Sequence, residues 1–344
     1  MKVLLAMSGG VDSSVAGAVL LDEGHDVVGV TMKLWGGESD TGCCSVSDVD
    51  DARRVAQQLG IDHLVFNFTE DFNTHVVDPY VQAHTVGITP NPCIECNRHL
   101  KFARLSERAT TLGFDAVATG HHTRIATDAN GVARVARGAD PAKDQSYVVH
   151  MLDQREIART MFPIGGMTKA DVRARATEIG LRTAAKPDSQ DVCFIGATTG
   201  RQVFLGSRIP FRSAVVRDLD GADIGSVEAV ELVTIGQRRG LDLGGAVGRR
   251  YVVDVDPVAG VVTVGNDADL YVEQMQTLDL TWGDAPVSGD VLVQCSAHGA
   301  THAARLDGSG LLRWHEPQRR ISPGQSVVFY DASDTFVLGG GIAA

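Results

Sequence analysis

The chain has 344 residues, 44% of them hydrophobic, and 31 Lys and Arg residues against 43 Asp and Glu residues give a formal net charge of −12. This length allows two or three domains with buried cores, and the acidic balance excludes a broadly basic nucleic-acid-binding surface, though not local basic clusters. The apolar runs are too short to span a bilayer and no signal peptide is recognised, so we expect a cytoplasmic protein with no membrane association.

The first elements of the chain are a predicted strand, a glycine turn and a helix. The apolar run 2–5 precedes the loop Ala6-Met7-Ser8-Gly9-Gly10-Val11-Asp12-Ser13-Ser14, and an apolar helix is predicted over 15–21. Two glycines allow a sharp turn and a close approach to a ligand, and the first helical turn presents unpaired N–H groups and a partial positive charge. The loop is neither a Walker A sequence nor GxGxxG. An ordinary turn rich in small residues is the alternative, but the serines and Asp12 favour phosphate binding.

Strands and helices alternate through the first half of the chain. Strands are predicted over 26–32, 64–68 and 114–119, and a helix begins with a capping-box pattern at Ser47 and Asp50 and ends at Gly60. This alternation predicts an α/β fold with a doubly wound, mostly parallel sheet, whose ligands lie at the carboxyl ends of the strands. The glycine loop, Met32, Cys96 and Gly120-His121 all follow predicted strands, so one cleft could collect them.

The pattern changes after about residue 200. Short strands replace the helical periodicity over 251–255 and 261–264, and nearly all of the chain from about 279 is predicted to be β. Strands over 291–297, 326–330 and 335–338 are separated by Gly and Asp turns, as in a small barrel.

Cysteine spacing suggests thiol chemistry. Cys93 and Cys96 form a Cys-x-x-Cys pair in what we predict to be a polar, proline-bounded loop, which is typical of redox or metal-ligating sites. A zinc site normally has four ligands, often from two such pairs. The sequence has no second Cys-x-x-Cys pair, although Cys43 and Cys44 are adjacent. Sequence alone does not place Cys193 near the pair, and Cys295 is expected to be a small buried hydrophobe.

Several motifs together resemble a known family. The glycine loop resembles the pyrophosphate loop of the ATP-pyrophosphatase superfamily, whose members activate substrates by adenylation. Five further motifs resemble the tRNA-specific 2-thiouridylase (MnmA/TrmU) family over nearly the whole chain: Thr89-Pro90-Asn91-Pro92 with Cys96-Asn97, Thr119-Gly120-His121, Lys143-Asp144-Gln145-Ser146-Tyr147, Lys186-Pro187-Asp188-Ser189-Gln190-Asp191 with Cys193-Phe194, and Ile235-Gly236-Gln237-Arg238-Arg239-Gly240-Leu241. The resemblance implies an ATP-pyrophosphatase domain over 1–201, a small central tRNA-contacting domain over 202–277 and a C-terminal β-barrel over 278–344.

The resemblance also implies a reaction, the ATP-dependent 2-thiolation of the wobble uridine of tRNA. Adenylation with ATP and Mg²⁺ would make the uracil C2 oxygen a leaving group. Cys193 would carry a persulfide supplied by a sulfur-relay protein or a cysteine desulfurase, and Cys96 would resolve the linkage through a transient disulfide with Cys193. In an alternative order, Cys96 releases hydrosulfide, which attacks the base. The free protein is expected to be a monomer.

The same resemblance implies contact residues. It implies ATP contacts along Ala6–Ser13, at Met32 and at Gly120; target-base contacts at Asn91, Pro92 and Cys93; and tRNA contacts at His121, Lys143, Asp144, Gln145, Arg313, Trp314 and Gln325. Other interpretations stay open for three of these residues, because Met32 could be plain core, His121 a hydrogen-bonded core histidine and Trp314 a packing residue.

The chain departs from the family pattern at Cys93, where many members have an acidic residue. Cys93, Cys96 and Cys193 could instead hold a 4Fe–4S cluster with one open iron. Two other functions remain as alternatives: an amidating or ligating adenylyl enzyme of the same superfamily, which would not need the two cysteines, and a non-catalytic iron–sulfur or sulfur-carrier RNA-binding protein.

Overall fold

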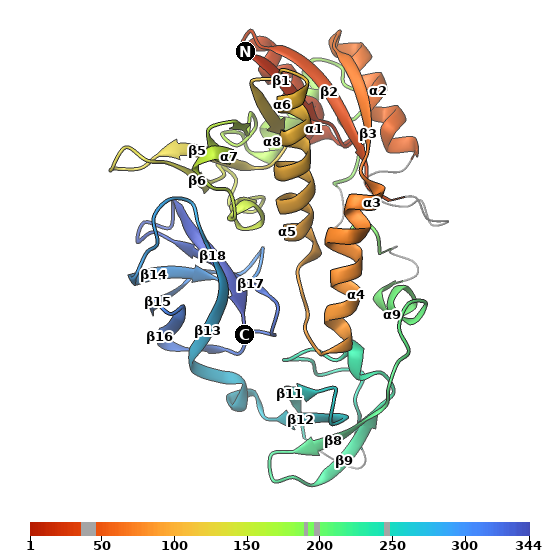
Figure 1. The fold of residues 1–344 in the computed structure, drawn as a ribbon, viewed down its shortest axis with the longest axis vertical. Coiled ribbons are helices and arrows are strands. Elements are labelled where there is room, and N and C mark those ends of the chain that lie inside the picture. Colours follow the sequence, from red (N-terminus) through yellow and green to blue (C-terminus); the bar gives the residue numbers. More distant parts are fainter. Residues whose placement is uncertain (36–45, 189–191, 196–199, 244–247) are drawn as a thin grey trace.

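The computed structural model describes residues 1–35, 46–188, 192–195, 200–243 and 248–344. It has an N-terminal α/β part at the top of Figure 1, a central β part at the bottom and a C-terminal barrel beside them. The predicted fold class, a parallel-sheet domain followed by a small central domain and a β-barrel, is confirmed.

The N-terminal part is built on a parallel sheet in the strand order β3-β2-β1-β4-β7. Its strands are Lys2–Ala6 (β1), Asp26–Lys33 (β2), Asp62–Asn67 (β3), Ala116–Thr119 (β4) and Thr160–Met161 (β7). Successive side chains of β1 enter different cores, because Leu4 packs in one apolar cluster while Val3 and Leu5 pack in the other. The sheet is therefore buried on both faces, as expected for a doubly wound fold.

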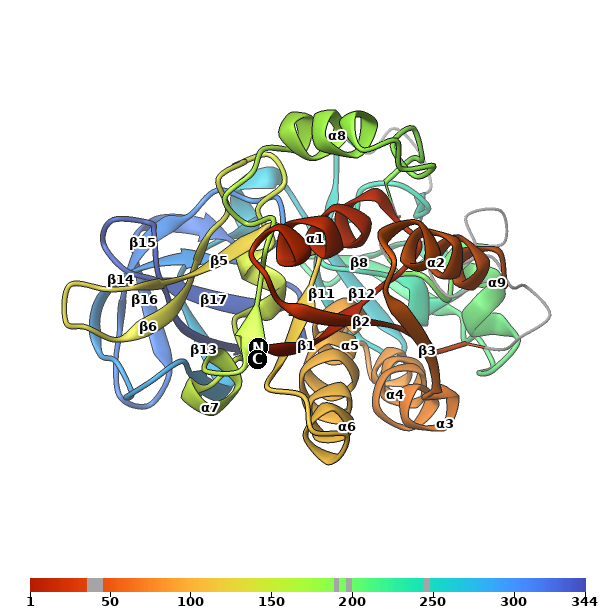
Figure 2. The same cartoon turned by 90° about the horizontal axis from the view of Figure 1, so that it is seen from above.

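Helices cover the two faces of this sheet, with α1, α2 and α8 on one face and α3 to α6 on the other (Figure 2). The first group is Val11–Asp22 (α1), Val46–Leu59 (α2) and Lys169–Glu178 (α8). The second group is Thr69–Phe72 (α3), Asp78–Thr85 (α4), Pro92–Cys96 (α5) and Leu105–Thr111 (α6), with π-helical turns at Asn73–Val77 (η1) and Asn97–Arg104 (η2) joining them. The remaining elements are a hairpin, Thr123–Thr127 (β5) and Ala133–Arg137 (β6), and the helices Ser146–Val149 (η3) and Gln154–Ile157 (α7).

Two local predictions are wrong. Cys93 and Cys96 lie in helix α5 rather than in a loop, because Asn91 caps the helix and Pro92 takes its first turn, where a missing N–H costs nothing. Helix α2 is already helical at Val46, so Ser47 lies inside its first turn and is not the N-cap.

The central part is a mixed sheet in the order β10-β9-β8-β12-β11 around a valine-rich core. Its elements are Gly200–Gly206 (α9), Ala214–Asp218 (β8), Asp223–Val227 (β9), Val230–Leu232 (η4), Asp242–Leu243 (β10), Tyr251–Asp256 (β11), Val261–Gly265 (β12) and Asp267–Leu270 (η5).

The C-terminal part is a closed barrel in the order β13-β16-β15-β14-β17-β18. Its strands are Tyr271–Trp282 (β13), Gly289–Gln294 (β14), His302–Leu306 (β15), Leu311–Arg319 (β16), Ser326–Tyr330 (β17) and Val337–Ala343 (β18). Strand β13 spans position 277, and its pairing with β16 already begins at Tyr271.

The barrel packs directly on the α/β part. Tyr330 and Val337 of the barrel share an apolar cluster with Phe102 and Tyr147, and the Tyr147 hydroxyl donates to the Ser326 carbonyl at 2.8 Å. This seam fixes the barrel beside the carboxyl ends of the parallel strands.

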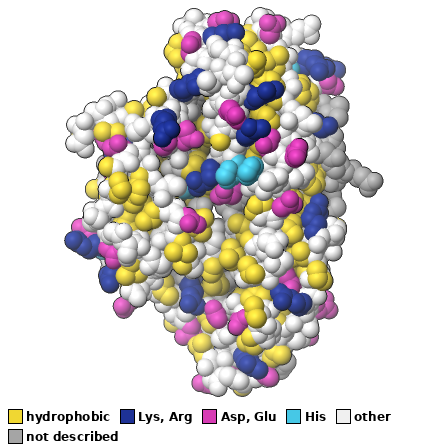
Figure 3. Space-filling model, in the orientation of Figure 1, with side chains coloured by type: hydrophobic (Ala, Val, Ile, Leu, Met, Phe, Trp, Pro, Cys, Tyr) yellow, Lys and Arg dark blue, Asp and Glu magenta, His cyan; other side chains and the backbone are white. Residues whose placement is uncertain are grey.

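The surface is mixed in charge. On the face shown in Figure 3, acidic and basic side chains are interspersed, and histidine side chains gather near its middle. None of the helices in the described part of the chain has the length and apolar content that a membrane span requires.

Candidate active site

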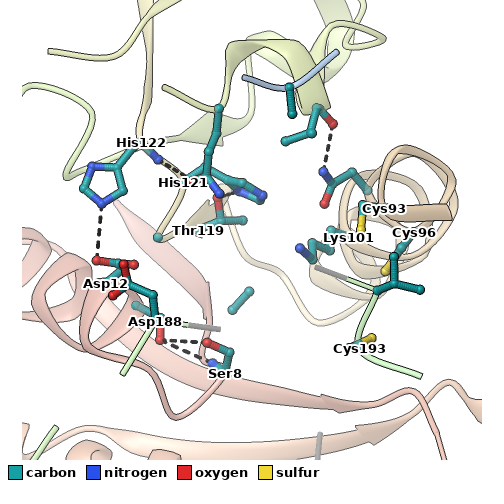
Figure 4. Close-up of a pocket in the computed structure, with 18 of the residues that line it drawn as sticks. Ser8, Asp12, Cys93, Cys96, Lys101, Thr119, His121, His122, Asp188 and Cys193 are labelled. Carbon is teal, nitrogen blue, oxygen red and sulfur yellow. Dashed lines mark hydrogen bonds and ion pairs between the residues drawn. The ribbon is translucent and has the colours of Figure 1, made fainter. Parts of the chain in front are cut away.

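A cavity of about 600 Å³ lies at the carboxyl ends of the parallel strands. It is lined from the glycine loop and β1, the ends of β2 and β4, helices α5 and η2, the 143–148 segment, Lys169, Asp188, Val192–Phe194 and two barrel residues. Figure 4 shows its two ends, one marked by Ser8, Asp12, His122 and Asp188, the other by Cys93, Cys96, Lys101 and Cys193. We call these the nucleotide end and the thiol end.

The glycine loop leaves no room for side chains where it turns. Gly9 has φ +71°, and a Cβ there would lie 2.4 Å from the Asp48 carbonyl oxygen; a Cβ on Gly120 would lie 2.6 Å from the Ser13 nitrogen. Gly10 is the N-cap of α1, and no side chain in the described residues caps it. A helix N-terminus of this kind, with the Ser8 and Ser13 hydroxyls beside it, fits the phosphates of a nucleotide.

Asp12 is held by two partners at the nucleotide end. Lys169 Nζ donates to both of its carboxylate oxygens at 2.7 and 2.8 Å, and His122 Nε2 lies 3.2 Å from Oδ1. Burial raises the pKa of Asp12, but the bonds with His122 and Lys169 outweigh burial and bring the pKa below its usual value. Asp12 is therefore a carboxylate at neutral pH.

Asp188 is the second carboxylate at this end. Its oxygens lie 2.9 Å from Lys143 Nζ, 2.9 Å from Lys169 Nζ and 2.7 Å from Arg173 Nη2. Burial alone would raise the pKa of Asp188, but the bonds with Lys143 and Lys169 lower it well below the usual range.

Two histidines follow β4 and have different surroundings. The His121 ring lies 2.6 Å from the Thr119 hydroxyl, and burial, with a smaller effect of Lys101, brings the pKa of His121 well below its usual value. His121 is therefore neutral at physiological pH. The His122 N–H donates to the Gln145 side-chain oxygen at 2.8 Å and the Gln145 N–H donates to the His122 carbonyl at 2.9 Å, which ties the 143–145 segment to the end of the sheet.

Helix α5 positions the thiol end. The Asn91 side chain accepts a hydrogen bond from the Cys93 N–H at 3.1 Å, and the buried Asn97 side chain donates to the Val148 carbonyl at 2.8 Å. These bonds fix both ends of the short helix, so that Cys93 and Cys96 line the cavity. Lys101 lines it too, and among the described residues it has no hydrogen-bond or ion-pair partner.

Cys193 is positioned by its neighbour. The Phe194 ring is buried and packs against Phe72, Tyr80 and Phe204, at centroid distances of 5.6, 5.5 and 5.1 Å. This aromatic cluster anchors the chain beside Cys193, whose side chain lines the cavity.

Most of the residues expected from the sequence meet in this cavity. Those that line it are Ala6, Met7, Ser8, Asp12, Ser13, Met32, Pro92, Cys93, Cys96, Gly120, His121, Lys143, Asp144, Gln145 and Cys193. Met32 also packs in the core, and its contact with ATP stays a prediction. Asp144 is engaged elsewhere as well, because it accepts from Arg137, from Ser146 and from the Gly138 N–H.

The three expected contacts in the barrel lie outside the cavity lining. Arg313 projects outward with 58% of its side chain exposed, whereas Trp314 is 8% exposed in the barrel core. Gln325 donates from its side chain to the carbonyl of Thr89, two residues before Asn91. Gln325 therefore joins the barrel to the loop that leads into α5.

The residues that line the cavity but were not assigned to the site from the sequence include Lys101, Lys169, Ala297 and His298. A signal existed for Lys169, because Thr168 and Asp171 form a capping box that places Lys169 in the first turn of α8. Ala297 and His298 follow β14, and only docking of the barrel brings them to the cavity. No local pattern could have shown this.

The three cysteines of the thiol end are the candidate metal ligands. Among the described residues, no group of three or more His, Cys, Asp and Glu side chains is arranged to hold a metal ion. Cys93, Cys96 and Cys193 share a cavity but, as they lie, do not form a cluster site. Cys43, Cys44 and residues 189–191 fall outside the described part of the chain.

Comparison with known proteins gives matches along the whole chain. Family models described as tRNA methyl transferase HUP domain, tRNA methyl transferase PRC-barrel domain and aminomethyltransferase beta-barrel domain match residues 1–197, 202–266 and 274–343. A tRNA-specific 2-thiouridylase MnmA of Chloroflexus aurantiacus is 46% identical over 99% of this chain and 97% of its own length. An MnmA of Mycobacteroides abscessus is 43% identical over 99% of both chains. A solved 4-thiouridine synthetase–RNA complex with bound ATP is 24% identical, with a TM-score of 0.37, over 56% of this chain and 44% of its own.

Proposed function

This chain belongs to the tRNA-specific 2-thiouridylase family, and we propose that it replaces the C2 oxygen of the wobble uridine of tRNA with sulfur, at the expense of ATP. The observation that supports this proposal is the shared cavity. Cys96 and Cys193, far apart in the sequence, line the same space as Ser8 and Ser13 of the glycine loop.

The nucleotide end would activate the base. The uncapped N-terminus of α1 and the Ser8 and Ser13 hydroxyls would hold the phosphates of ATP, while the uracil C2 oxygen attacks the α-phosphorus and pyrophosphate leaves. Mg²⁺ would neutralise charge on the phosphates, and Asp12 would help to bind it. The neutral His121 contributes no charge of its own to this end.

The thiol end would supply the sulfur. A persulfide on Cys193 attacks C2 with its terminal sulfur, and the bond from C2 to the adenylated oxygen breaks as AMP leaves. Cys96 then attacks the Cys193 Sγ, so the persulfide S–S bond breaks, the sulfur stays on C2 and a Cys96–Cys193 disulfide forms. An external thiol reduces that disulfide before the next cycle. Anchoring by Phe194 on one side and α5 on the other keeps both sulfurs within the cavity.

Binding of tRNA would use residues around the rim. Asn91, Pro92 and Cys93 would contact the target base, and His121, Lys143 and Gln145 the surrounding nucleotides. In the barrel, Arg313 is exposed for a phosphate contact, while Trp314 would support it from the core and Gln325 would hold the loop before Asn91. The persulfide would come from a sulfur-relay protein or a cysteine desulfurase, and we propose a cytoplasmic monomer as the working form.

The test is nucleoside mass spectrometry of unmodified tRNA incubated with the protein, ATP, Mg²⁺ and a persulfide source. We expect 2-thiouridine with the wild type and none with Cys96→Ser or Cys193→Ser. Cys295→Ser is the matched control, because burial raises the pKa of Cys295 to about 12 and keeps that thiol protonated. Undiminished product from either active-site variant would favour an adenylating ligase or amidase instead.

Two further measurements separate the remaining alternatives. Pyrophosphate release that requires both ATP and unmodified tRNA is expected of the enzyme, and its absence would favour a non-catalytic sulfur carrier. Iron and acid-labile sulfide are measured on anaerobically purified protein, and full turnover by iron-free protein would rule out a cluster requirement.

A further inference from the structure

Lys169 bridges two carboxylates at the nucleotide end, Asp12 and Asp188. Its Nζ contacts both oxygens of Asp12 in the glycine loop and, at 2.9 Å, one oxygen of Asp188 in the segment that leads to Cys193. Lys143 and Arg173 also contact Asp188. Asp188 therefore faces three cations, and it shares one of them, Lys169, with Asp12.

The bridge lies where phosphates are expected. Lys169 and Asp188 line the cavity together with Ser8 and Ser13, and the Lys169 side chain is only 12% exposed. The Lys169 backbone N–H is fixed by the Asp140 carboxylate at 2.9 Å, so a change of partner needs only a new rotamer of the side chain.

We propose that Asp188 competes with a nucleotide for Lys169: its carboxylate pairs with the Lys169 side chain, and bound ATP draws Lys169 from Asp188 onto its phosphates. This inference rests on the proposed use of ATP, and it assigns Lys169 as a phosphate-binding residue and Asp188 as its internal competitor. A phosphate chain offers several charged oxygens where Asp188 offers two, which favours the exchange.

The test measures the Kd for ATP by equilibrium binding to the full-length protein, with MgCl₂ and separately with EDTA. Asp188→Asn removes the competitor and is expected to lower the Kd for ATP about fivefold, whereas Lys169→Met raises it about tenfold, and Lys169→Arg restores part of the loss. Glu178→Gln is the matched control, because it removes an acid that pairs with Arg175 on the exposed side of α8, the helix that also carries Lys169. An unchanged or raised Kd in Asp188→Asn overturns the proposal, and a rise seen only with MgCl₂ identifies Asp188 as a metal ligand instead.

If 2-thiouridine forms while the Kd for ATP does not respond to Asp188→Asn, the proposed function stands and this inference falls; if no thiolation occurs but ATP binding responds to Asp188→Asn, the reverse holds.

Discussion

The nucleotide end and the thiol end of the cavity are held in place by different physics. At the nucleotide end, Asp12 and Asp188 are fixed by ion pairs with Lys169, Lys143 and Arg173. At the thiol end, the supports are uncharged: Phe194 packs among aromatic rings, and hydrogen bonds of Asn91 and Asn97 hold the two ends of α5.

This contrast fits the two steps of the proposed reaction, activation of the base with ATP and delivery of the sulfur. Ion pairs can be exchanged for a charged ligand at small net cost, because one set of contacts replaces another. An aromatic anchor offers no such exchange, and it keeps a sulfur atom in one place while its bonding partners change. We therefore expect the two ends to respond differently to truncation, acid and loss of charge.

The largest expected effect is at the aromatic anchor. Phe194→Ala should lower the free energy of unfolding by about 4 kcal/mol, because it empties a site enclosed by Phe72, Tyr80 and Phe204, whereas Phe194→Leu should cost only about 1 kcal/mol. Urea denaturation measures both values. A loss below about 1 kcal/mol in Phe194→Ala would show that this end is not held by packing.

The next effect is at the glycine loop. Asp12→Asn keeps the shape but weakens the contacts with Lys169 and His122, and should lower kcat/KM for ATP about 30-fold with little change in the KM for tRNA. Steady-state pyrophosphate release is the measurement. If Asp12→Asn impaired the use of ATP and of tRNA equally, the nucleotide end and the thiol end would not act separately.

Acid should weaken the nucleotide end selectively. The pKa of Asp188 is lowered in the folded protein, so its contribution to stability is complete above the unfolded pKa of about 4 and is lost as the pH falls toward the folded value. With about a third of this side chain exposed, we expect that loss to be about 1 kcal/mol. The free energy of unfolding, measured from pH 6 to pH 3, should therefore fall less steeply in Asp188→Asn than in the wild type. Parallel curves would show that Asp188 does not contribute to this pH dependence.

The two ends also differ in how far the sequence predicts them. The glycine loop and β1 are contiguous, so composition and spacing alone indicate a phosphate site there. Cys193 and Cys96 line one cavity only because Phe194 packs on the core, and no local sequence pattern predicts that long-range contact. Family resemblance supplied it instead.

The same reason explains the errors and omissions. A Cys-x-x-Cys pair beside prolines favours a loop, yet Asn91 and Pro92 supply a helix start that the motif does not reveal. Ala297 and His298 reach the cavity through the barrel seam, whose contacts join residues far apart in the chain. Long-range packing decides these positions.

The smallest stability effect should come from Lys101, the cation at the thiol end. In the described residues it has neither an ion pair nor a hydrogen bond, unlike Lys143 and Lys169, so Lys101→Met should change the free energy of unfolding by less than about 0.5 kcal/mol. Its positive charge is one cause of the low pKa of His121, after burial, so the variant should also raise that pKa slightly, as NMR titration can show. A cation kept in a cavity without a counter-ion is suited to an anion that arrives with the substrate, and we expect the KM for tRNA to rise about threefold. Lys169→Met, matched in chemistry but taken from the ion-paired end, should instead lower stability by about 1 kcal/mol and leave the KM for tRNA unchanged. If both variants behave alike, the cavity has one kind of support throughout and the distinction between its ends fails.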